Sequence, residues 1–197
     1  MKLRSALFAV AFGLLVSFTA SADDLGPSRS DNPPPTSALS AFQRFESAPI
    51  VMGAPWAGQK GNDIAKDKLQ DNLDLRLKPL LAEWNAKEAG ETPRTLRIEP
   101  TIKHIRFITG GKRFWGGAFA GGSSILVSVK LIDATSGEVV AEPEFYQHAN
   151  AMGAAWSFGA TDKTMLIRIS NMVTEYVRNN YAQAVGGSVS VAPEIDN

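Results

Sequence analysis

The chain has 197 residues, of which 20 are Lys or Arg and 20 are Asp or Glu, and 44% are hydrophobic. This balance of charge excludes the basic signature of nucleic-acid-binding proteins, which neutralise phosphates with clustered Lys and Arg. The hydrophobic content is sufficient for a globular core, and the absence of cysteine excludes disulfides and thiol nucleophiles.

The first 22 residues have the three parts of a cleavable secretory signal peptide. Lys2 and Arg4 form a basic start, an uncharged apolar stretch follows, and Ala20-Ser21-Ala22 is a small-x-small cleavage site. A membrane anchor is the competing interpretation, but the apolar stretch is shorter than the about 20 residues that a span needs. It is also followed at once by Asp23-Asp24. We therefore expect cleavage near Ala22 and a periplasmic or secreted protein.

Cleavage would remove two of the 20 basic residues and leave a net charge of −2. Bacterial lipoproteins carry their lipid on a cysteine at the cleavage site, and this chain has no cysteine. Membrane association, if it occurs, is therefore not expected to depend on lipidation.

Composition divides the rest of the chain into three segments. Residues 23–40 contain Pro33-Pro34-Pro35 among Ser, Asp and Asn and predict a disordered leader. Residues 41–184 predict a single α/β domain, and residues 185–197 a flexible C-terminal tail.

The first half of the domain predicts a strand, a helix and a second strand. Apolar alternation over 42–51 indicates a strand interrupted by Pro49. A helix capped by Asn62 or Asp63 follows, and Pro79 within it predicts a kink or break. Its apolar stripe consists of Leu69, Leu73, Leu77, Leu80, Leu81 and Trp84.

In the second half, residues 95–108 predict a strand whose apolar phase changes at Lys103-His104, which indicates a β-bulge. Residues 124–132 alternate clearly and predict the next strand, and the turn Asp133–Gly137 leads into a returning strand over 138–146. Thr161 or Asp162 then caps a final amphipathic helix. The fold class is α/β (an α+β sandwich), with a mostly antiparallel sheet of about four strands and two helices packed on one face.

Groups that could carry catalysis are sparse. His104 and His148 are the two histidines, and they lie far apart in the sequence, where structural roles are the common case. No His/Asp/Glu grouping predicts a metal site, and no motif predicts a cofactor. The carboxylates of the first helix alternate with Lys and Arg at spacings typical of a solvated face.

A glycine-rich segment over 110–122 is the most distinctive feature. It is neither a phosphate-binding loop nor followed by the helix that such a loop requires. One interpretation is a structural loop, in which the glycines allow unusual backbone angles. Another is a recognition loop, since Trp and Arg dominate binding hot spots. The candidate binding residues are Lys112, Arg113, Phe114 and Trp115, and the candidate turn residues are Gly116, Gly117, Gly121, Gly122, Asp133 and Gly137.

A third interpretation concerns membranes. Residues 114–129 form an uncharged run, and Gly117–Gly121 fits a Gly-x-x-x-Gly helix-packing pattern. The run is too short to span a bilayer as a helix, and its second half alternates as a strand. A contribution to an oligomer on or in the outer membrane stays open.

The stretch from Gly110 to Tyr181 resembles a family of uncharacterised bacterial exported proteins, the domain-of-unknown-function family numbered forty-four ten. The resemblance lies in Gly111-Lys112-Arg113, the glycine-rich run after it, the strand from Ser124, and the turn at Asp133–Gly137. It implies an α/β fold akin to small periplasmic and outer-membrane accessory domains, with no established activity. Many members are lipoproteins, whereas this chain would be a non-lipidated one.

The sequence thus predicts an exported, non-enzymatic accessory or binding domain that uses the 110–122 loop to contact an unknown envelope protein or another copy of itself. The alternatives are an outer-membrane-associated assembly protein that uses 114–129, and an unrecognised hydrolase that uses His104 or His148.

Overall fold

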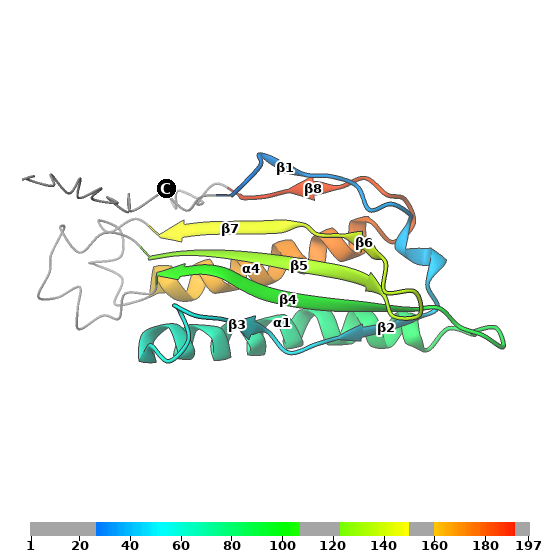
Figure 1. The fold of residues 1–197 in the computed structure, drawn as a ribbon, viewed down its shortest axis with the longest axis horizontal. Coiled ribbons are helices and arrows are strands. Elements are labelled where there is room, and N and C mark those ends of the chain that lie inside the picture. The colour runs from blue at the N-terminus through cyan, green and yellow to red at the C-terminus, as the bar shows by residue number, and fades with distance from the viewer. Residues whose placement is uncertain (1–26, 107–122, 150–159, 192–197) are drawn as a thin grey trace, which may run out of the picture.

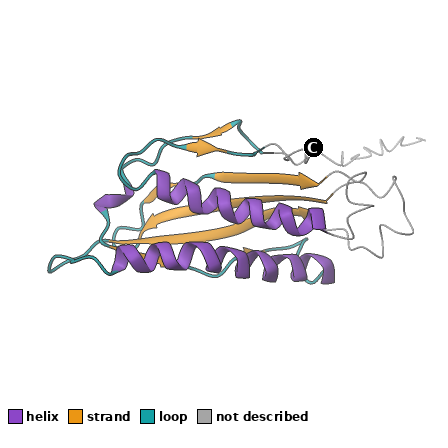
Figure 2. Cartoon of the chain, turned by 180° about the vertical axis from the view of Figure 1, so that it is seen from behind, coloured by secondary structure: helices purple, strands orange, loops and turns teal. Residues whose placement is uncertain are grey.

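The computed structural model describes residues 27–106, 123–149 and 160–191, which form a sheet covered by helices. Helices α1 (Lys60–Asn85) and α4 (Ala160–Asn179) lie side by side on one face of the sheet (Figure 2). No described helix covers the other face, which we call the open face. The predicted α+β class with two helices on one face is confirmed.

The sheet has an antiparallel centre and mixed edges. Its central strands are β4 (Thr95–Arg106) and β5 (Ser123–Asp133). Outside β5 lie β6 (Val139–Ala141) and β7 (Glu144–Ala149), both antiparallel to it.

The opposite edge departs from the expected pattern. Strands β2 (Arg44–Ser47) and β3 (Val51–Met52) are both parallel to β4. The chain reaches β4 from β3 through helix α1, and a crossover through a helix returns a strand in the parallel sense. The sheet is therefore mixed and six-stranded, so the expected mostly antiparallel sheet of about four strands is matched only roughly.

Helix α1 begins earlier and runs further than the sequence predicts. It starts at Lys60, before the expected caps, and continues through Pro79 to Asn85, so the described helix has no break. Pro79 lies on the exposed side of the helix, where water can bond the carbonyl that the missing donor leaves free. Neighbouring Leu75 is 72% exposed, which places that part of the helix in solvent.

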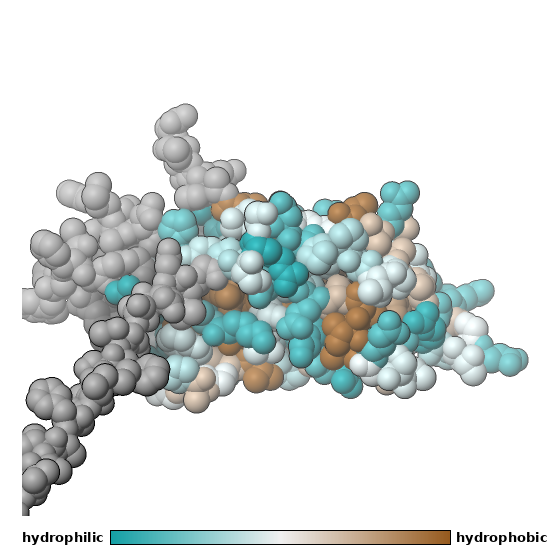
Figure 3. Space-filling model, turned by 45° about the horizontal axis from the view of Figure 1, so that its top comes forward, coloured by the Kyte–Doolittle hydropathy of each residue, from teal (hydrophilic) through white to brown (hydrophobic). Residues whose placement is uncertain are grey.

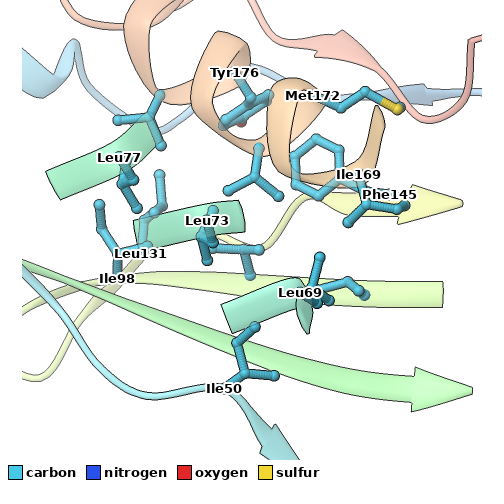
Figure 4. Packing of buried hydrophobic residues seen from close by; sticks show 14 of the residues in the cluster. Ile50, Leu69, Leu73, Leu77, Ile98, Leu131, Phe145, Ile169, Met172 and Tyr176 are labelled. Atoms are coloured by element: carbon cyan, nitrogen blue, oxygen red, sulfur yellow. The ribbon is translucent and has the colours of Figure 1, made fainter. Parts of the chain in front are cut away.

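The core lies between the helices and the sheet. Figure 4 shows Leu69, Leu73 and Leu77 of α1 packed among side chains of the strands and of α4. The other core residues shown there include Ile50, Ile98, Leu131, Phe145, Ile169, Met172 and Tyr176. The 3.6-residue period of each helix and the alternation of each strand therefore place their apolar faces in one shared core.

The bulge predicted in β4 is confirmed. Ile102 and Ile105 are both buried in the core, although they differ in alternation phase. The register with β5 shifts between Ile102 and His104, so one residue of β4 is left without an opposite partner. After the shift His104 pairs with Leu126, and Arg106 pairs with Ser124.

The turn between β5 and β6 is held by the side chain of Asp133. Its Oδ1 accepts the backbone N–H groups of Thr135 at 2.9 Å and Ser136 at 3.4 Å. Arg94 donates to Oδ2 at 2.8 Å, and this hydrogen bond is the main reason that the pKa of Asp133 is lowered. Gly137 has a φ of +76°, which a residue with a side chain adopts at a cost.

The leader and the tail are packed where the structure describes them. Strand β1 (Asp31–Asn32) pairs with β8 (Gly187–Ser188) in a two-stranded antiparallel sheet, and the short 3₁₀ helix η1 (Leu39–Ala41) follows β1. The Asn32 side chain both donates to and accepts from the backbone of Glu144, each at 2.7 Å. Polar anchoring of this kind leaves no apolar pattern, so composition alone predicts mobile ends here.

Asn180 connects the end of α4 to the C-terminal segment. It is 0% exposed, and its amide donates to the carbonyls of Tyr176 and Gly186. Its Oδ1 accepts the backbone N–H groups of Val185 and Gly186, each at 2.8 Å. A side chain at Gly186 would collide with the carbonyl oxygen of Asn32, so the two terminal segments meet without a gap.

Asn180→Ala is expected to destabilise the protein by about 2 to 4 kcal/mol, because it leaves buried backbone donors without partners. Urea denaturation followed by circular dichroism measures the change. Gln183→Ala, an exposed position in the same loop, is the control and is expected to change stability by less than about 0.5 kcal/mol. Equal effects of the two substitutions would contradict the buried role of Asn180.

Pro79→Ala is expected to stabilise the protein by about 1 to 3 kcal/mol, since it restores a helix hydrogen bond at an exposed position. The same urea experiment measures the gain. Lys78→Ala, the neighbouring exposed residue, serves as control and is expected to change stability by about 0.5 kcal/mol or less. A loss of stability in Pro79→Ala would show that the helix depends on the proline.

Candidate functional site

Strand β4 ends, strand β5 begins and strand β7 ends at the same end of the six-stranded sheet. We call this end the loop end. Strand β4 stops at Arg106 beside the start of β5, and the register pairs Ser124 with both Arg106 and His148. Helix α4 begins at the same end (Figure 1). Segments 107–122 and 150–159 therefore both join the described domain at the loop end.

Two histidines and a serine lie across the open face at this end, and we call His104, Ser124 and His148 the histidine row. The Nε2 atom of His104 lies 3.2 Å from the Oγ atom of Ser124. On the other side of β5, Ser124 is directly opposite His148. Their neighbours Ile105 and Ile125 face the core, so the alternation of the strands places the histidine row on the open face.

Trp56 holds His104 from the side. It comes from the loop between β3 and α1, and its ring meets the imidazole edge to face, with centroids 4.6 Å apart. The indole N–H donates to the carbonyl of Lys103 at 3.0 Å, at the bulge itself. No pattern in the sequence singles out Trp56 as a site residue. A large aromatic residue within the Gly53–Gly61 loop is the available signal, because such loops rarely need one for their own packing.

His104 is held mainly in its neutral form. Burial lowers its pKa below the ordinary value, and the positive charge of Arg106 lowers it further. Its Nδ1 atom is buried and has no hydrogen-bond partner among the described residues. In a catalytic triad that nitrogen donates to a carboxylate, which orients the base. The pair of Ser124 and His104 lacks this third member in the described part of the chain.

The other side of the row is more open to solvent. His148 is exposed, and its ring stacks on Tyr146 with centroids 6.0 Å apart and an interplanar angle of 27°. Arg106 is also exposed and lies opposite Ser124 on β4. The loop end therefore presents two imidazoles, a hydroxyl and a guanidinium from three adjacent strands.

The sequence-predicted binding residues Lys112, Arg113, Phe114 and Trp115 lie outside the described residues, as do Gly116, Gly117, Gly121 and Gly122. What the structure adds is the position of the two residues between which this segment runs. Arg106 and Ser123 are its described neighbours, and both lie beside the histidine row. The expected signal peptide also lies outside the described residues and stays a prediction.

A groove of about 310 Å³ lies elsewhere, between α1 and the segment that joins β2 to β3. Its polar groups are already paired. Asp74 accepts from Lys78 at 2.6 Å and from Gln70 at 2.8 Å, and the Gln70 Oε1 accepts the Ile50 backbone N–H. These carboxylates belong to a solvated helix face. Among the described residues, no group of three or more His, Cys, Asp or Glu could hold a metal ion.

The structure describes the second half of the uncharged run 114–129. Residues 123–129 belong to β5, which is hydrogen-bonded to β4 on one side and to β7 on the other. Ile125, Val127 and Val129 of this strand face the core. A membrane cannot contact those three side chains in this fold. Within the part of the chain that the structure describes, no helix has the length and apolar character to cross a bilayer.

Comparisons with known proteins give distant structural similarity. No family model matches the sequence, and no curated protein matches it. The resemblance to the family numbered forty-four ten therefore stays a prediction.

Three solved structures illustrate the level of similarity. The PelC dodecamer from Paraburkholderia phytofirmans is 16% identical over 72% of this chain and 91% of that chain, with a TM-score of 0.37. A protein from Xanthomonas campestris, described as family-model DUF330, is 10% identical to this chain. The match covers 78% of this chain and 95% of that chain, with a TM-score of 0.42. A minor lipoprotein from Acinetobacter baumannii is 11% identical over 70% of this chain and 94% of that chain, with a TM-score of 0.34. At these values the similarity carries no argument about function.

The ring of His104 is expected to titrate with a midpoint below 6.5, because burial and Arg106 both disfavour its charged form. The unfolded state then binds the proton more readily, so this residue contributes stability above its unfolded pKa that is lost as the pH falls. Proton NMR of the imidazole ring measures the midpoint. Arg106→Gln is expected to raise it without restoring the ordinary value, since burial remains.

Lys130→Gln is the matched control, because Lys130 is an exposed cation on the same strand system far from the loop end. It is expected to leave the His104 midpoint unchanged. A midpoint at or above 6.5 in the wild-type chain would contradict the buried, neutral state of His104.

Proposed function

We propose that the chain is an exported, non-enzymatic accessory or binding domain of the bacterial envelope that contacts its partner through the loop end. The observation that carries this proposal is that the two histidines and the described residues flanking the glycine-rich segment lie at one end of the sheet. His104 closely precedes the glycine-rich segment, whereas His148 is distant from both in the sequence, and the sheet register brings His148 opposite Ser124, next to the described residues that flank that segment.

The composition of the glycine-rich segment supports a role in contact. Arg113 and Trp115 belong to the residue types that contribute most to protein interfaces. Export is proposed from the signal-peptide pattern of the first 22 residues.

The described groups favour binding over catalysis. Ser124 and His104 are close enough for a proton transfer, which is the specific observation in favour of a hydrolase. Yet Nδ1 of His104 has no described partner to orient the ring or to stabilise its charged form. The hydrolase is therefore the second candidate. It predicts that replacing both histidines abolishes an activity found in a broad screen of ester and amide substrates.

The outer-membrane assembly alternative has fewer residues available for membrane contact than the sequence suggests. Since Ile125, Val127 and Val129 face the core, membrane contact through this run would not involve those three side chains. Finding all of the exported chain as a soluble monomer would exclude this alternative.

The proposal predicts that a photoreactive amino acid in place of Trp115 cross-links to a defined protein in cells. The matched control carries the same group in place of Leu75, which is 72% exposed on the far side of α1. Adducts are identified by mass spectrometry after purification of the exported chain. We expect a defined adduct at position 115 that is absent at position 75, and an adduct with a second copy of the chain would identify self-association.

Lipid adducts at position 115 would favour the outer-membrane alternative instead. Identical adducts at both positions, or none at position 115 in a folded and exported chain, would contradict the assignment of the loop end as the contact surface.

A further inference from the structure

Charge is distributed unevenly along this nearly neutral chain. From Pro100 to Ile132 there is no Asp or Glu, and the segment 145–161 also has none. The first of these stretches contains the basic residues Lys103, Arg106, Lys112, Arg113 and Lys130. Because the mature chain is expected to be slightly acidic, its carboxylates must be concentrated elsewhere.

The fold places these two acid-free stretches next to each other at the loop end. The first supplies the end of β4 and all of β5 except Asp133, and the second supplies nearly all of β7. The carboxylates of the open face lie further along the strands. Among them, Glu99 pairs with Arg97 at 2.7 Å, and Glu142 lies 3.9 Å from Lys103.

Another carboxylate on this side, Glu144, is also engaged. Its Oε2 accepts both the backbone N–H of Ser28 at 3.0 Å and the hydroxyl of Ser28 at 2.6 Å. No described carboxylate is bonded to His104, Ser124 or His148 in the contacts of the structure. The open face thus changes along its strands from mixed charge to a basic end, and hydrophilic and hydrophobic residues are interspersed on the described surface seen in Figure 3.

The groups at this end are hydrogen-bond donors of the kind that bind anions. Arg106 presents a planar fork of N–H groups, Ser124 a hydroxyl, and His148 an imidazole that can donate. The register puts Arg106 and His148 on either side of Ser124, so the three side chains extend from neighbouring positions of adjacent strands on the same face. Neighbouring strands are about 4.8 Å apart, a spacing that these side chains can bridge.

Burial is the larger cause of the lowered pKa of His104, and the charge of Arg106 is the second, which indicates that the guanidinium lies within electrostatic reach of the imidazole. The charge of Arg106 reaches the imidazole and disfavours its protonation. An anion between the two groups would offset this repulsion. The buried Nδ1 has no hydrogen-bond partner among the described residues, so none of their carboxylates holds His104.

We propose that the loop end binds a phosphate group, held by Arg106, Ser124 and His148 on the open face with His104 as the neutral wall of the site. A phosphate fits better than a carboxylate because its oxygens point in several directions and can accept donors from all three strands, whereas one arginine satisfies both oxygens of a carboxylate. This inference rests on the proposed function, since it names the ligand chemistry of the same contact surface. The group is either free phosphate or part of a lipid headgroup.

The test follows the imidazole signals of the untagged, exported full chain by proton NMR. The chain has two histidines, so two ring signals are expected, and His148→Gln assigns them by removing one. Inorganic phosphate is titrated at neutral pH with the ionic strength held constant by potassium chloride. The proposal predicts saturable shifts of the His104 and His148 signals.

Substitutions then locate the site. Arg106→Gln and Ser124→Ala are each expected to weaken phosphate binding, Arg106→Gln by about tenfold, since it removes a charge-assisted hydrogen bond. Lys130→Gln is the matched control. Lys130 is exposed on the same strand as Ser124 but six residues away, about 20 Å along the strand and beyond the Debye length.

A second arm distinguishes the two sources of phosphate. The chain is mixed with vesicles of phosphatidylcholine that contain or lack phosphatidylglycerol, and co-sedimentation is measured with and without Arg106→Gln. Sedimentation with the anionic vesicles that Arg106→Gln abolishes would support a headgroup, and saturable shifts with inorganic phosphate alone would support a free phosphate.

No saturable shift and no sedimentation of the folded wild-type chain would overturn the phosphate site. Equal loss of binding in Arg106→Gln and Lys130→Gln would do so as well, because it would indicate a general effect of charge. These outcomes are separable from the proposed function. If position 115 cross-links to a protein but phosphate does not bind, the proposed contact surface still stands. Only the proposed phosphate ligand is then wrong.

Discussion

The single extra residue in β4 is the constraint on which the candidate site depends. Strict alternation from Leu96, Ile98 and Ile102 would turn His104 into the core and Ile105 out to solvent. Burying an unpaired imidazole is costly, whereas burying isoleucine stabilises the fold by about 2 kcal/mol. The bulge returns Ile105 to the core and places His104 on the open face, where its Nε2 atom lies within hydrogen-bond distance of Ser124 although its Nδ1 atom stays buried.

Side chains of asparagine occupy backbone positions at both edges of the six-stranded sheet. Unpaired backbone groups of an edge strand invite pairing with another chain. At one edge Asn85 accepts the Phe45 N–H at 2.8 Å and donates to the Phe45 carbonyl at 2.9 Å. At the opposite edge Asn32 makes the equivalent pair of bonds with Glu144. Asparagine side chains thus occupy positions that a further strand would use, which disfavours growth of the sheet through its edges.

Periodic patterns made much of the fold predictable, and polar contacts over long range made the rest unpredictable. The stripe from Leu69 to Trp84 indicates α1, and the phase change at His104 indicates the bulge. The parallel pairing of β2 could not be read from its own residues, because parallel and antiparallel strands carry the same alternation.

The two histidines of the candidate site were likewise predictable from the sequence, whereas their contacts were not. The sequence singles out His104, His148 and the glycine-rich segment separately, since nothing in their spacing indicates contact. Only the register through Ser124 brings the two histidines to one face. Trp56 and the packing of the terminal segments depend on single hydrogen bonds to residues distant in sequence, such as Asn32 to Glu144. Such bonds have no periodic signature.

The most direct test of this account is the contact between His104 and Ser124, measured by nuclear Overhauser effects in the full chain. The account predicts effects from the ring protons of His104 to the β-protons of Ser124 and to the indole of Trp56, since the first pair of side chains lies within hydrogen-bond distance and the two rings are 4.6 Å apart. Effects from the His104 ring to core side chains such as Leu69 and Leu73, with none to Ser124, would contradict it. In that case the bulge would not orient His104 to the open face, and the loop end would lose the arrangement from which its function is argued.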